Sequence, residues 1–492
     1  MTELEQRVQT LEEEVAVASN DTNSPRLAGL LARLGTNLAA IGQRTRGIET
    51  VQRAIALYEE QGDRRGLAEA LNRLGALFCM EQPEEARIVL QRALETAREA
   101  GARSEEATSL NNLAILDEVA GDFEGSRQRY ERSIEILRRV GDRSKPASTL
   151  NNLGLVLDKS DHDDLAQAAW AEALAMHVEV GNDAGTASTL SNMGGALERH
   201  GDPNRAIEHY KDAVAIQERV GETGELMIHL GNLAVAYSKL GRHAEACEAW
   251  RRKLRVAEAI GDKRRVAATL HVLAGDLASA GSATEADDCF ARATSAFTDL
   301  GDREEVALVA IDHAHARSEA GDHASALALG EHALALRIEL GVEWHLAAVL
   351  DNVGLLYGAA GDHARAIELL ERSLVLTERV GDNEGLATVL SNLGDACDEA
   401  DLDLKAVGYY ERALPLIEKS GKRDALASVL DDLGRLYYVR RNDAAAIAAT
   451  QGAMAIYKPG PSKERLRARL QRLVNDRAKE EATRTTRTES DD

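Results

Sequence analysis

The stretch Ser148-Thr149-Leu150-Asn151-Asn152-Leu153-Gly154 decides the fold, because close copies of it return along the chain at a fixed spacing. We call the residue before the closing glycine or alanine of each copy the marker residue. The marker residues are Leu34, Leu74, Leu113, Leu153, Met193, Leu233, Leu273, His313, Val353, Leu393 and Leu433. Successive markers are 40 residues apart, except for one interval of 39. Self-similarity at such a period indicates a solenoid of eleven repeats.

Each repeat reads as two antiparallel helices. In the repeat around residues 144–181, apolar residues recur at helical spacing on both sides of the polar stretch 160–162. Elsewhere a Gly-Asp pair such as Gly121-Asp122 marks the turn, since glycine suits the left-handed position that closes a helix and aspartate caps the next one. A second set of glycines, of which Gly141 and Gly181 are examples, closes each repeat.

Small and large residues alternate in a fixed order after each marker. Gly154 follows the marker Leu153, Ala166 comes thirteen residues after the marker, and Trp170 seventeen after it. A glycine inside a helix costs about 0.5 to 1 kcal/mol relative to alanine, so some packing gain must offset it. We expect Gly154 and Ala166 to face each other, with the aromatic ring filling the space beside them.

Composition narrows the possible functions. The chain has 492 residues, 59 lysines and arginines against 82 aspartates and glutamates, and a net charge of −23. This charge repels phosphate backbones and anionic lipid, and aromatics make up only 3% of the chain, so we expect neither nucleic-acid nor membrane binding. The acidic N-terminus does not resemble a signal peptide, and no apolar run reaches the length of a membrane span. Four widely spaced cysteines indicate buried free thiols in a reducing compartment, and we expect a cytoplasmic protein.

The two ends of the chain differ from the repeats. Residues 1–22 predict an N-terminal helix, whose apolar residues at alternating spacings of four and three fit either a short coiled coil that self-associates through residues 1–17 or a cap on the first repeat. The eleven repeats occupy residues 24–458. Residues 459–480 predict a C-terminal capping helix, and the polar residues 481–492 predict a disordered tail.

The order of small, large and small residues resembles the tetratricopeptide repeat (TPR), and the resemblance covers about nine-tenths of the chain. The usual TPR unit has 34 residues. Both the longer period and the Gly-Asp turns are similar to the branch found in kinesin light chain, the Pins/LGN polarity scaffolds and bacterial TPR regulators. The resemblance implies an all-α, right-handed α-solenoid whose concave wall, lined by the first helices, holds an extended peptide.

Asparagine recurs one residue before the marker. The six positions are Asn112, Asn152, Asn192, Asn232, Asn352 and Asn392. A side-chain amide carries donors and an acceptor, so a ladder of amides on the groove wall can pair with the backbone of an extended peptide. The resemblance implies this clamping role as well. Alternatively, the amides bond to each other or to the next helix and pin the stacking of the repeats.

Residues beside the asparagines change along the chain. Ile115 and Leu155 make the wall apolar in the third and fourth repeats, whereas Asp395 and Asp432 make it acidic near the C-terminus. A partner with an apolar and a basic segment would suit both. The pattern weakens over residues 266–340, which suggests either a flexible joint or sequence drift.

Sequence patterns typical of catalysis do not emerge. His313 and His315 alternate on one predicted helix and point in different directions, and the glycines lie at helix ends rather than in phosphate-binding loops. We therefore predict no enzyme, no cofactor and no metal, and a scaffold that binds a protein or peptide in its groove. The alternatives are a sensor whose superhelical pitch changes when a signalling peptide binds, and an enzyme-modulating subunit like the Rap-type phosphatases.

Overall fold

The computed structural model describes residues 3–19, 25–79, 81–142, 145–221 and 224–488. Within these ranges it contains 24 helices and no strand, which confirms the predicted all-α repeat fold. The chain divides into two compact halves, residues 1–242 and 243–492, and each is described by itself.

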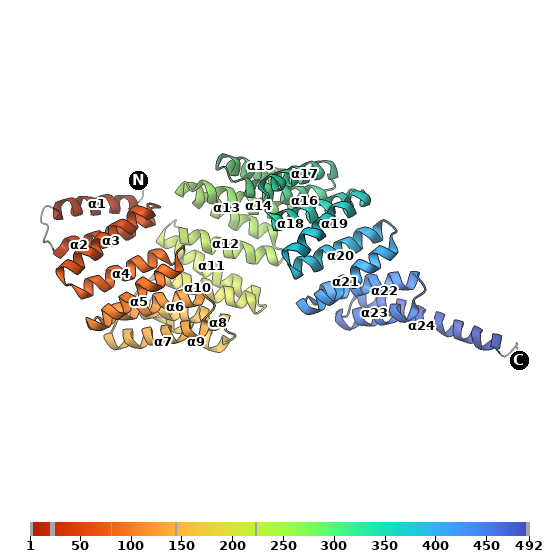
Figure 1. The fold of residues 1–492 in the computed structure, drawn as a ribbon, viewed down its shortest axis with the longest axis horizontal. Coiled ribbons are helices and arrows are strands. Elements are labelled where there is room, and N and C mark those ends of the chain that lie inside the picture. The colour runs from red at the N-terminus through yellow and green to blue at the C-terminus, as the bar shows by residue number, and fades with distance from the viewer. Residues whose placement is uncertain (1–2, 20–24, 80, 143–144, 222–223, 489–492) are drawn as a thin grey trace. The chain divides into compact units, whose positions relative to one another are not determined.

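The helices of the N-terminal half follow one another at short intervals (Figure 1). They are α1 Glu3–Ala18, α2 Pro25–Ala40, α3 Arg44–Gln61, α4 Arg64–Phe78, α5 Pro83–Glu99, α6 Arg103–Val119, α7 Phe123–Val140, α8 Lys145–Lys159, α9 Asp163–Glu179, α10 Asp183–Arg199, α11 Pro203–Val220 and α12 Gly224–Lys239.

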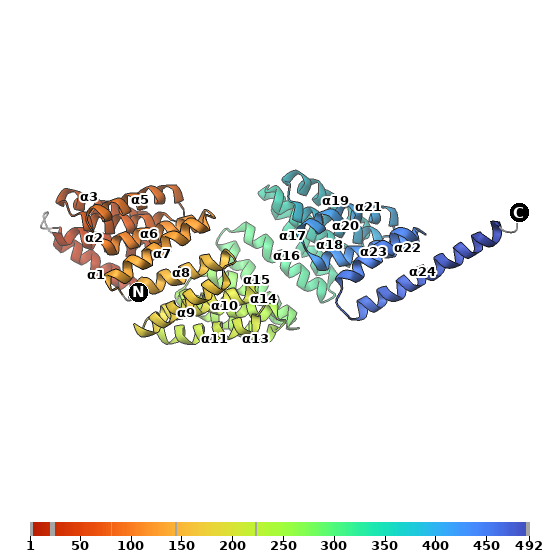
Figure 2. The same ribbon diagram turned by 90° about the horizontal axis from the view of Figure 1, so that it is seen from below.

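The C-terminal half continues the same alternation (Figure 2). Its helices are α13 His243–Ile260, α14 Lys263–Ser279, α15 Ala283–Asp299, α16 Arg303–Glu319, α17 His323–Leu340, α18 Glu343–Ala359, α19 His363–Val380, α20 Asn383–Glu399, α21 Asp403–Ser420, α22 Arg423–Val439, α23 Asp443–Ile456 and α24 Pro461–Thr488.

Helices α2 to α23 form eleven sequential pairs, as the eleven marker residues predict. Inside each half, the two helices of a pair pack on each other, and the second helix of a pair also packs on the first helix of the next one. First helices of neighbouring pairs, such as α8 and α10, touch as well. This arrangement makes one continuous layer of first helices within each half.

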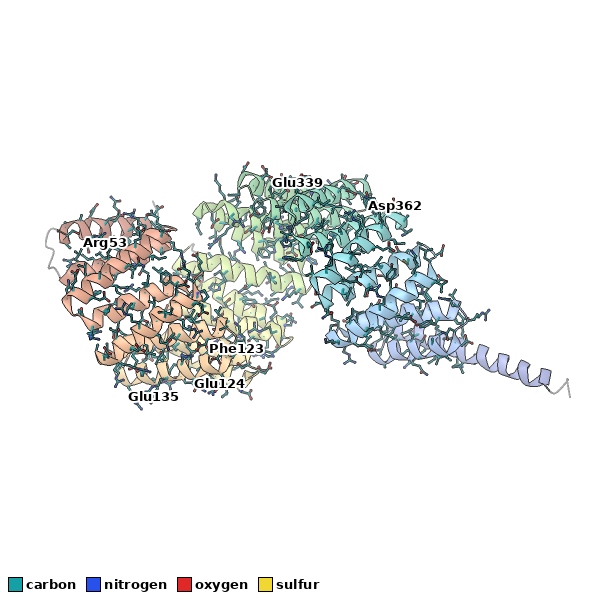
Figure 3. The ribbon with its side chains drawn as sticks, viewed as in Figure 1. Arg53, Phe123, Glu124, Glu135, Glu339 and Asp362 are labelled. Carbon is teal, nitrogen blue, oxygen red and sulfur yellow. The ribbon has the colours of Figure 1, made fainter. Side chains whose placement is uncertain are left out.

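Turn residues explain the regular breaks between helices. Gly141 ends α7 with a φ of 78°, in the left-handed region that glycine enters at little cost. Asp362, labelled in Figure 3, begins α19 by accepting a hydrogen bond from the backbone N of Arg365 at 3.0 Å. Glycine and aspartate therefore act as the stop and start signals that their spacing predicts.

Among the described residues, three turns place a residue other than glycine in the left-handed region. One of them yields a stability prediction. Arg441 has a φ of 60°, where an L-residue with a Cβ atom pays roughly 1 to 2 kcal/mol. Because the residue is exposed and glycine is free of this penalty, Arg441→Gly should raise local stability by about 1 kcal/mol. Slower hydrogen exchange in α22 and α23 would verify this. Unchanged exchange would mean that the turn carries no strain.

Glycines after the marker residues allow a close approach between the two helices of a pair. A Cβ atom on Gly154 in α8 would lie 2.6 Å from Cε2 of Trp170 in α9. Trp170 is fully buried, and its Nε1 donates a hydrogen bond to the backbone O of Asn151 at 3.1 Å. The indole itself therefore lies directly against the glycine, and the expected contact between Gly154 and Ala166 stays a prediction. Gly194 and Tyr210 repeat this contact in the next pair.

Helix α1 packs as a cap on the first repeat. Its residues Val8 and Leu11 are buried in a cluster with Leu30, Leu34 and Leu38 of α2. On α3, Arg46 binds Glu12 at 2.6 Å. The apolar residues of the predicted coiled coil are thus used inside the chain, which favours the capping interpretation over self-association.

Helix α24 covers the other end of the repeats. Leu466 and Leu473 are fully buried, and Arg469 donates hydrogen bonds to the backbone O of Asp431 at 2.9 Å and to its carboxylate at 2.6 Å. The helix runs to Thr488, so the prediction of a helix that ends at residue 480 and a disordered tail from 481 was wrong for residues 481–488. Alanine, glutamate, lysine and arginine dominate residues 478–484, and these are good helix formers despite their polarity.

Two further predictions concern the middle of the chain and the cysteines. Residues 266–340 form α14 to α17 in the regular pattern, and the boundary between the halves falls before them, at residue 242. All four cysteines are free thiols, and only Cys79 is not buried. None of the described helices combines the length and the apolar character that crossing a membrane requires.

Candidate peptide-binding surface

The six predicted asparagines lie on first helices and are all half-buried. In the N-terminal half, Asn112 is on α6, Asn152 on α8, Asn192 on α10 and Asn232 on α12. In the C-terminal half, α18 carries Asn352 and α20 carries Asn392. Their neighbours Leu153 and Leu393 are buried, so each asparagine stands at the border between the core and the surface of its layer.

In the N-terminal half, two of these amides connect neighbouring first helices, whereas Asn112 accepts a hydrogen bond from Nδ2 of Asn111 in its own helix at 3.4 Å. Nδ2 of Asn192 donates to Oδ1 of Asn151 at 3.0 Å, and Nδ2 of Asn232 donates to Oγ of Ser191 at 3.0 Å. Both pairs are 41 residues apart in sequence. We call these contacts the amide ladder. It has the bonding pattern that the stacking interpretation describes.

The C-terminal half contains one contact of the same type and one variant. Nδ2 of Asn392 lies 3.0 Å from both carboxylate oxygens of Asp351, again 41 residues away. Oδ1 of Asn352 instead accepts a hydrogen bond from Nε2 of His315 at 3.1 Å. It also donates from Nδ2 to the backbone O of Ala348 at 3.0 Å.

The amide ladder uses only part of the bonding capacity of its amides. An asparagine side chain has two N–H donors and a carbonyl that accepts twice. Asn192, Asn232 and Asn392 each use Nδ2, and their carbonyl oxygens have no hydrogen bond within the described part of the chain. The side chain of Asn152 makes no hydrogen bond to any other described residue. Stacking and ligand binding are therefore compatible roles for this position.

A row of ion pairs runs beside the amide ladder in the N-terminal half. Nζ of Lys159 lies 2.7 Å from Oε1 of Glu118. The next pairs are Arg199 with Asp158 and Lys239 with Glu198, and each joins residues that are 41 apart. Each cation follows its marker by six residues, whereas each carboxylate follows the previous marker by five. The same one-residue offset therefore governs both rows.

A pocket of about 360 Å³ opens between the two rows. Three successive first helices line it, with Leu155 from α8, Asn192 and Gly195 from α10, and Asn232 from α12. The pocket exists because Gly195 stands where the neighbouring helices have Leu155 and Val235. We call it the Gly195 pocket. It brings three of the predicted site residues together, whereas Asn112 and Ile115 are on α6 and outside it.

Acidic residues predicted near the C-terminus form a partly neutralised cluster. Asp395 accepts a short hydrogen bond from the hydroxyl of Tyr410, and burial raises the pKa of this carboxyl. Burial, followed by the charge of Asp395, also raises the pKa of Asp432 to about 6. Arg435 contacts Asp398 closely and lies 3.9 Å from Asp432. Since Arg435 is shared by several carboxylates, the net charge of the cluster stays negative.

A second pocket, of about 300 Å³, lies between α18, α19 and α20. Trp344, Asp351 and Asn352 line it from α18, Val380 from α19, and Asp382 precedes α20. We call it the Trp344 pocket. We did not predict it, although a tryptophan outside the aromatic position of the repeat could have drawn attention to it.

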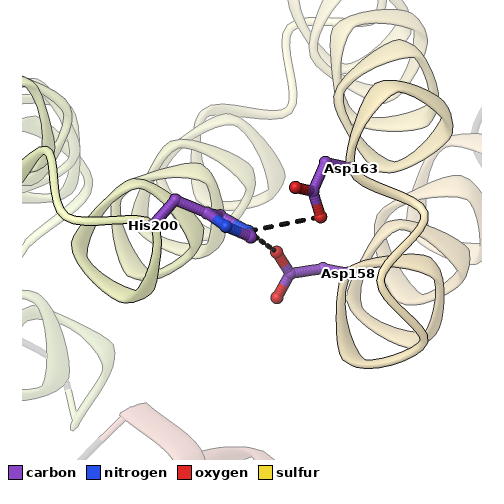
Figure 4. A group of neighbouring side chains, drawn as sticks. All are labelled: Asp158, Asp163 and His200. Carbon is purple, nitrogen blue, oxygen red and sulfur yellow. Dashed lines mark hydrogen bonds and ion pairs between the residues drawn. The ribbon is translucent and has the colours of Figure 1, made fainter.

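One group of side chains has the composition of a metal site. His200, Asp158 and Asp163 bring ligand atoms within 4.8 Å of one another (Figure 4). Nε2 of His200 lies 3.1 Å from Asp158 and 3.4 Å from Asp163. The other oxygen of the buried Asp158, however, binds the guanidinium of Arg199. A metal ion would have to share this carboxylate with a fixed cation, so we interpret the group as an ion-pair network.

His313 replaces the marker leucine in α16. Its ring stacks on Phe290 of α15 with centroids 4.6 Å apart, and its Nε2 lies 2.9 Å from Asp287. His315 points to Asn352 instead. The two histidines therefore serve different helices, as their spacing predicts, and His313 occupies a core position through an aromatic contact.

Together, the paired helices, the contact between glycine and aromatic residue, and the layer of first helices define a helical-repeat protein. A family model described as "Tetratricopeptide repeat" matches residues 26–99, 105–176, 163–219, 225–299 and 345–419. Since these matches cover more than half of the chain, the chain belongs to the tetratricopeptide repeat family, and the resemblance noted in the sequence is confirmed.

Comparisons with whole proteins give only distant similarities. No curated protein matches the sequence. One solved structure contains nearly identical TPR-like repeats of a Podosopora anserina kinesin light chain. It is 20% identical, with a TM-score of 0.35, over 39% of this chain and 96% of that one. A Rap protein complexed with Competence and Sporulation Factor is 16% identical, with a TM-score of 0.41, over 74% and 99%. The Pyrococcus horikoshii signal transduction ATPase with a TPR sensor is 13% identical, with a TM-score of 0.49, over 68% and 54%.

Proposed function

We propose that the chain is a non-catalytic scaffold that binds an extended segment of a partner protein along its first helices. The observation that supports the proposal most directly is the Gly195 pocket, because it spans three consecutive first helices between two rows of polar groups. Its amides retain unused carbonyl oxygens. TPR proteins as a family generally mediate protein–protein interactions. The cytoplasmic location of this protein stays a prediction.

The chemistry of this face suits a peptide backbone. Asn192 and Asn232 offer acceptors to backbone N–H groups, and one N–H of each amide remains for a carbonyl of the ligand. Arg199, Lys239 and its partner Glu198, from the row of ion pairs, also line the pocket. A side chain of the ligand would enter the space that Gly195 leaves open. Backbone contacts would then supply affinity, and the pocket would supply selectivity.

Two substitutions on this face should weaken binding of peptides selected from a random library on the immobilised protein. Gly195→Leu places an apolar side chain in the pocket, and its Cβ has room, since the nearest atoms to a Cβ there are at 3.6 and 3.7 Å. Asn152→Ala removes an amide that makes no internal hydrogen bond. We expect each change to raise Kd about tenfold, because one or two hydrogen bonds or one apolar anchor are worth about 1 to 2 kcal/mol. Fluorescence polarisation measures this.

The matched control is Gly408→Leu, because Gly408 is also a helical glycine with open space around it but lies exposed on the second helix α21. It should leave Kd unchanged. If Gly195→Leu and Asn152→Ala both fold and bind selected peptides as the wild type does, the first-helix face is not the binding surface.

A further inference from the structure

The Trp344 pocket combines an apolar wall with a carboxylate that has no cationic partner. Ala347, Ala348 and Val380 supply apolar surface, and Asp351 and Asp382 are its charged residues. No lysine or arginine lines it. Arg379, from the same helix as Val380, binds Glu343 at 2.7 Å. The pocket is therefore both partly dry and negatively charged.

Asp351 is the group to which a ligand could supply a cationic partner. Its two oxygens receive hydrogen bonds from Asn392 alone, and no ion pair to it occurs in the described residues. Burial raises the pKa of Asp351 to about 6, against smaller opposing effects of Asn392 and His315. A carboxylate withdrawn from water without a cation is costly, so a cation that enters the pocket gains more there than in solvent.

Trp344 adds the second feature that a cation prefers. The side chain is 59% exposed, and its indole is tilted by 42° against the ring of His345, with centroids 3.6 Å apart. The exposed surface of the indole can contact a ligand in the pocket. Tryptophan is the aromatic residue that attracts lysine and arginine most strongly through its ring face.

We propose that the Trp344 pocket receives the cationic end of a lysine or arginine side chain of the bound partner segment, paired with Asp351 and stacked on Trp344. The inference rests on the proposed function and names one residue type of the ligand. It also gives a location to the basic segment that the acidic C-terminal wall predicts. An anionic or purely apolar side chain would leave Asp351 unpaired.

The test uses tryptophan fluorescence of the full chain. The chain has three tryptophans, and Trp170 and Trp250 are buried, so a small solute in the pocket changes mainly the emission of Trp344. We expect N-acetyl-arginine amide and N-acetyl-lysine amide to shift it with a millimolar Kd. N-acetyl-norleucine amide, which lacks the charge, and N-acetyl-glutamate amide should bind at least tenfold more weakly.

Asp351→Asn keeps the shape and should raise Kd for the arginine probe at least tenfold, whereas Asp288→Asn, an exposed carboxylate on α15, should not change it. Equal binding of the norleucine probe, or unchanged binding to Asp351→Asn, would overturn the inference. So would no binding of either cationic probe. The peptide experiment with Gly195→Leu concerns the N-terminal half. Any of these three outcomes beside a positive peptide result would therefore refute the inference and leave the proposed function standing.

Discussion

Gly154→Ala should be among the most destabilising single changes in the N-terminal half, although it replaces glycine with the best helix former. The added Cβ would lie 2.6 Å from Cε2 and 2.7 Å from Cδ1 of Trp170. The indole cannot retreat easily, since it is fully buried and holds a hydrogen bond to the backbone O of Asn151. Overpacking of this kind costs typically 1 to 3 kcal/mol, and loss of the indole hydrogen bond adds about 1 kcal/mol.

The higher helix propensity of alanine offsets about 1 kcal/mol of this loss in stability. We therefore expect a net loss of about 2 kcal/mol in the local stability of α8 and α9, measured by hydrogen-exchange mass spectrometry. Gly275→Ala on α14 is the matched control, because nothing lies within 4 Å of a Cβ there. It should be neutral or stabilising. Equal protection of α8 and α9 in Gly154→Ala and wild type would show that the indole is not fixed against the glycine.

The second large effect concerns Asp351, whose substitution by asparagine should stabilise the protein at neutral pH but not in acid. Burial raises the pKa of this carboxyl from 3.8 to about 6 in the folded chain, so the folded state holds the proton more tightly than the unfolded state does. Stability from this group is present below about pH 4 and is lost as the pH rises through 6. Asparagine does not titrate, and its amide oxygen can still accept from Asn392.

Above pH 7, the difference between Asp351→Asn and wild type should therefore approach about 2 to 3 kcal/mol, since one pKa unit corresponds to 1.36 kcal/mol. The difference should shrink steadily between pH 6 and pH 4. Hydrogen exchange of α18 and α20, corrected for intrinsic rates, follows this profile. A constant difference at every pH would attribute the effect to packing instead of ionisation. Asp432 also has a pKa of about 6, but it is present in both proteins and cancels in the comparison.

Much of the fold could be predicted because its signals are local. Glycine at a positive φ, as in Gly141, and an aspartate cap, as in Asp362, need only their neighbours in sequence. The extent of α24 could not be predicted, because a polar helix and a polar disordered tail have similar composition. The direct contact between Gly154 and Trp170 could not be predicted either, since spacing shows which residues face the partner helix but not which of them touch.

The candidate site was harder to predict, because its partners come from different repeats. The position of Asn192 on a first helix follows from helical spacing, yet its bond to Asn151 depends on the offset between neighbouring helices. The Trp344 pocket combines residues of three helices. Only coordinates reveal that Asp351 is half-buried there and has no ion pair within the described part of the chain.

The amide and ion-pair rows also bear on how such a chain can evolve. If the repeat with the marker Met193 were lost, Asn232 would face Asn151 in place of Ser191, and Lys239 would face Asp158 in place of Glu198. An amide or a hydroxyl accepts equally well, and either carboxylate suits an ammonium group. Unequal recombination between neighbouring copies would thus preserve both the hydrogen bond and the ion pair between the newly adjacent repeats. Such arrays can therefore change length without evolving new contacts between repeats.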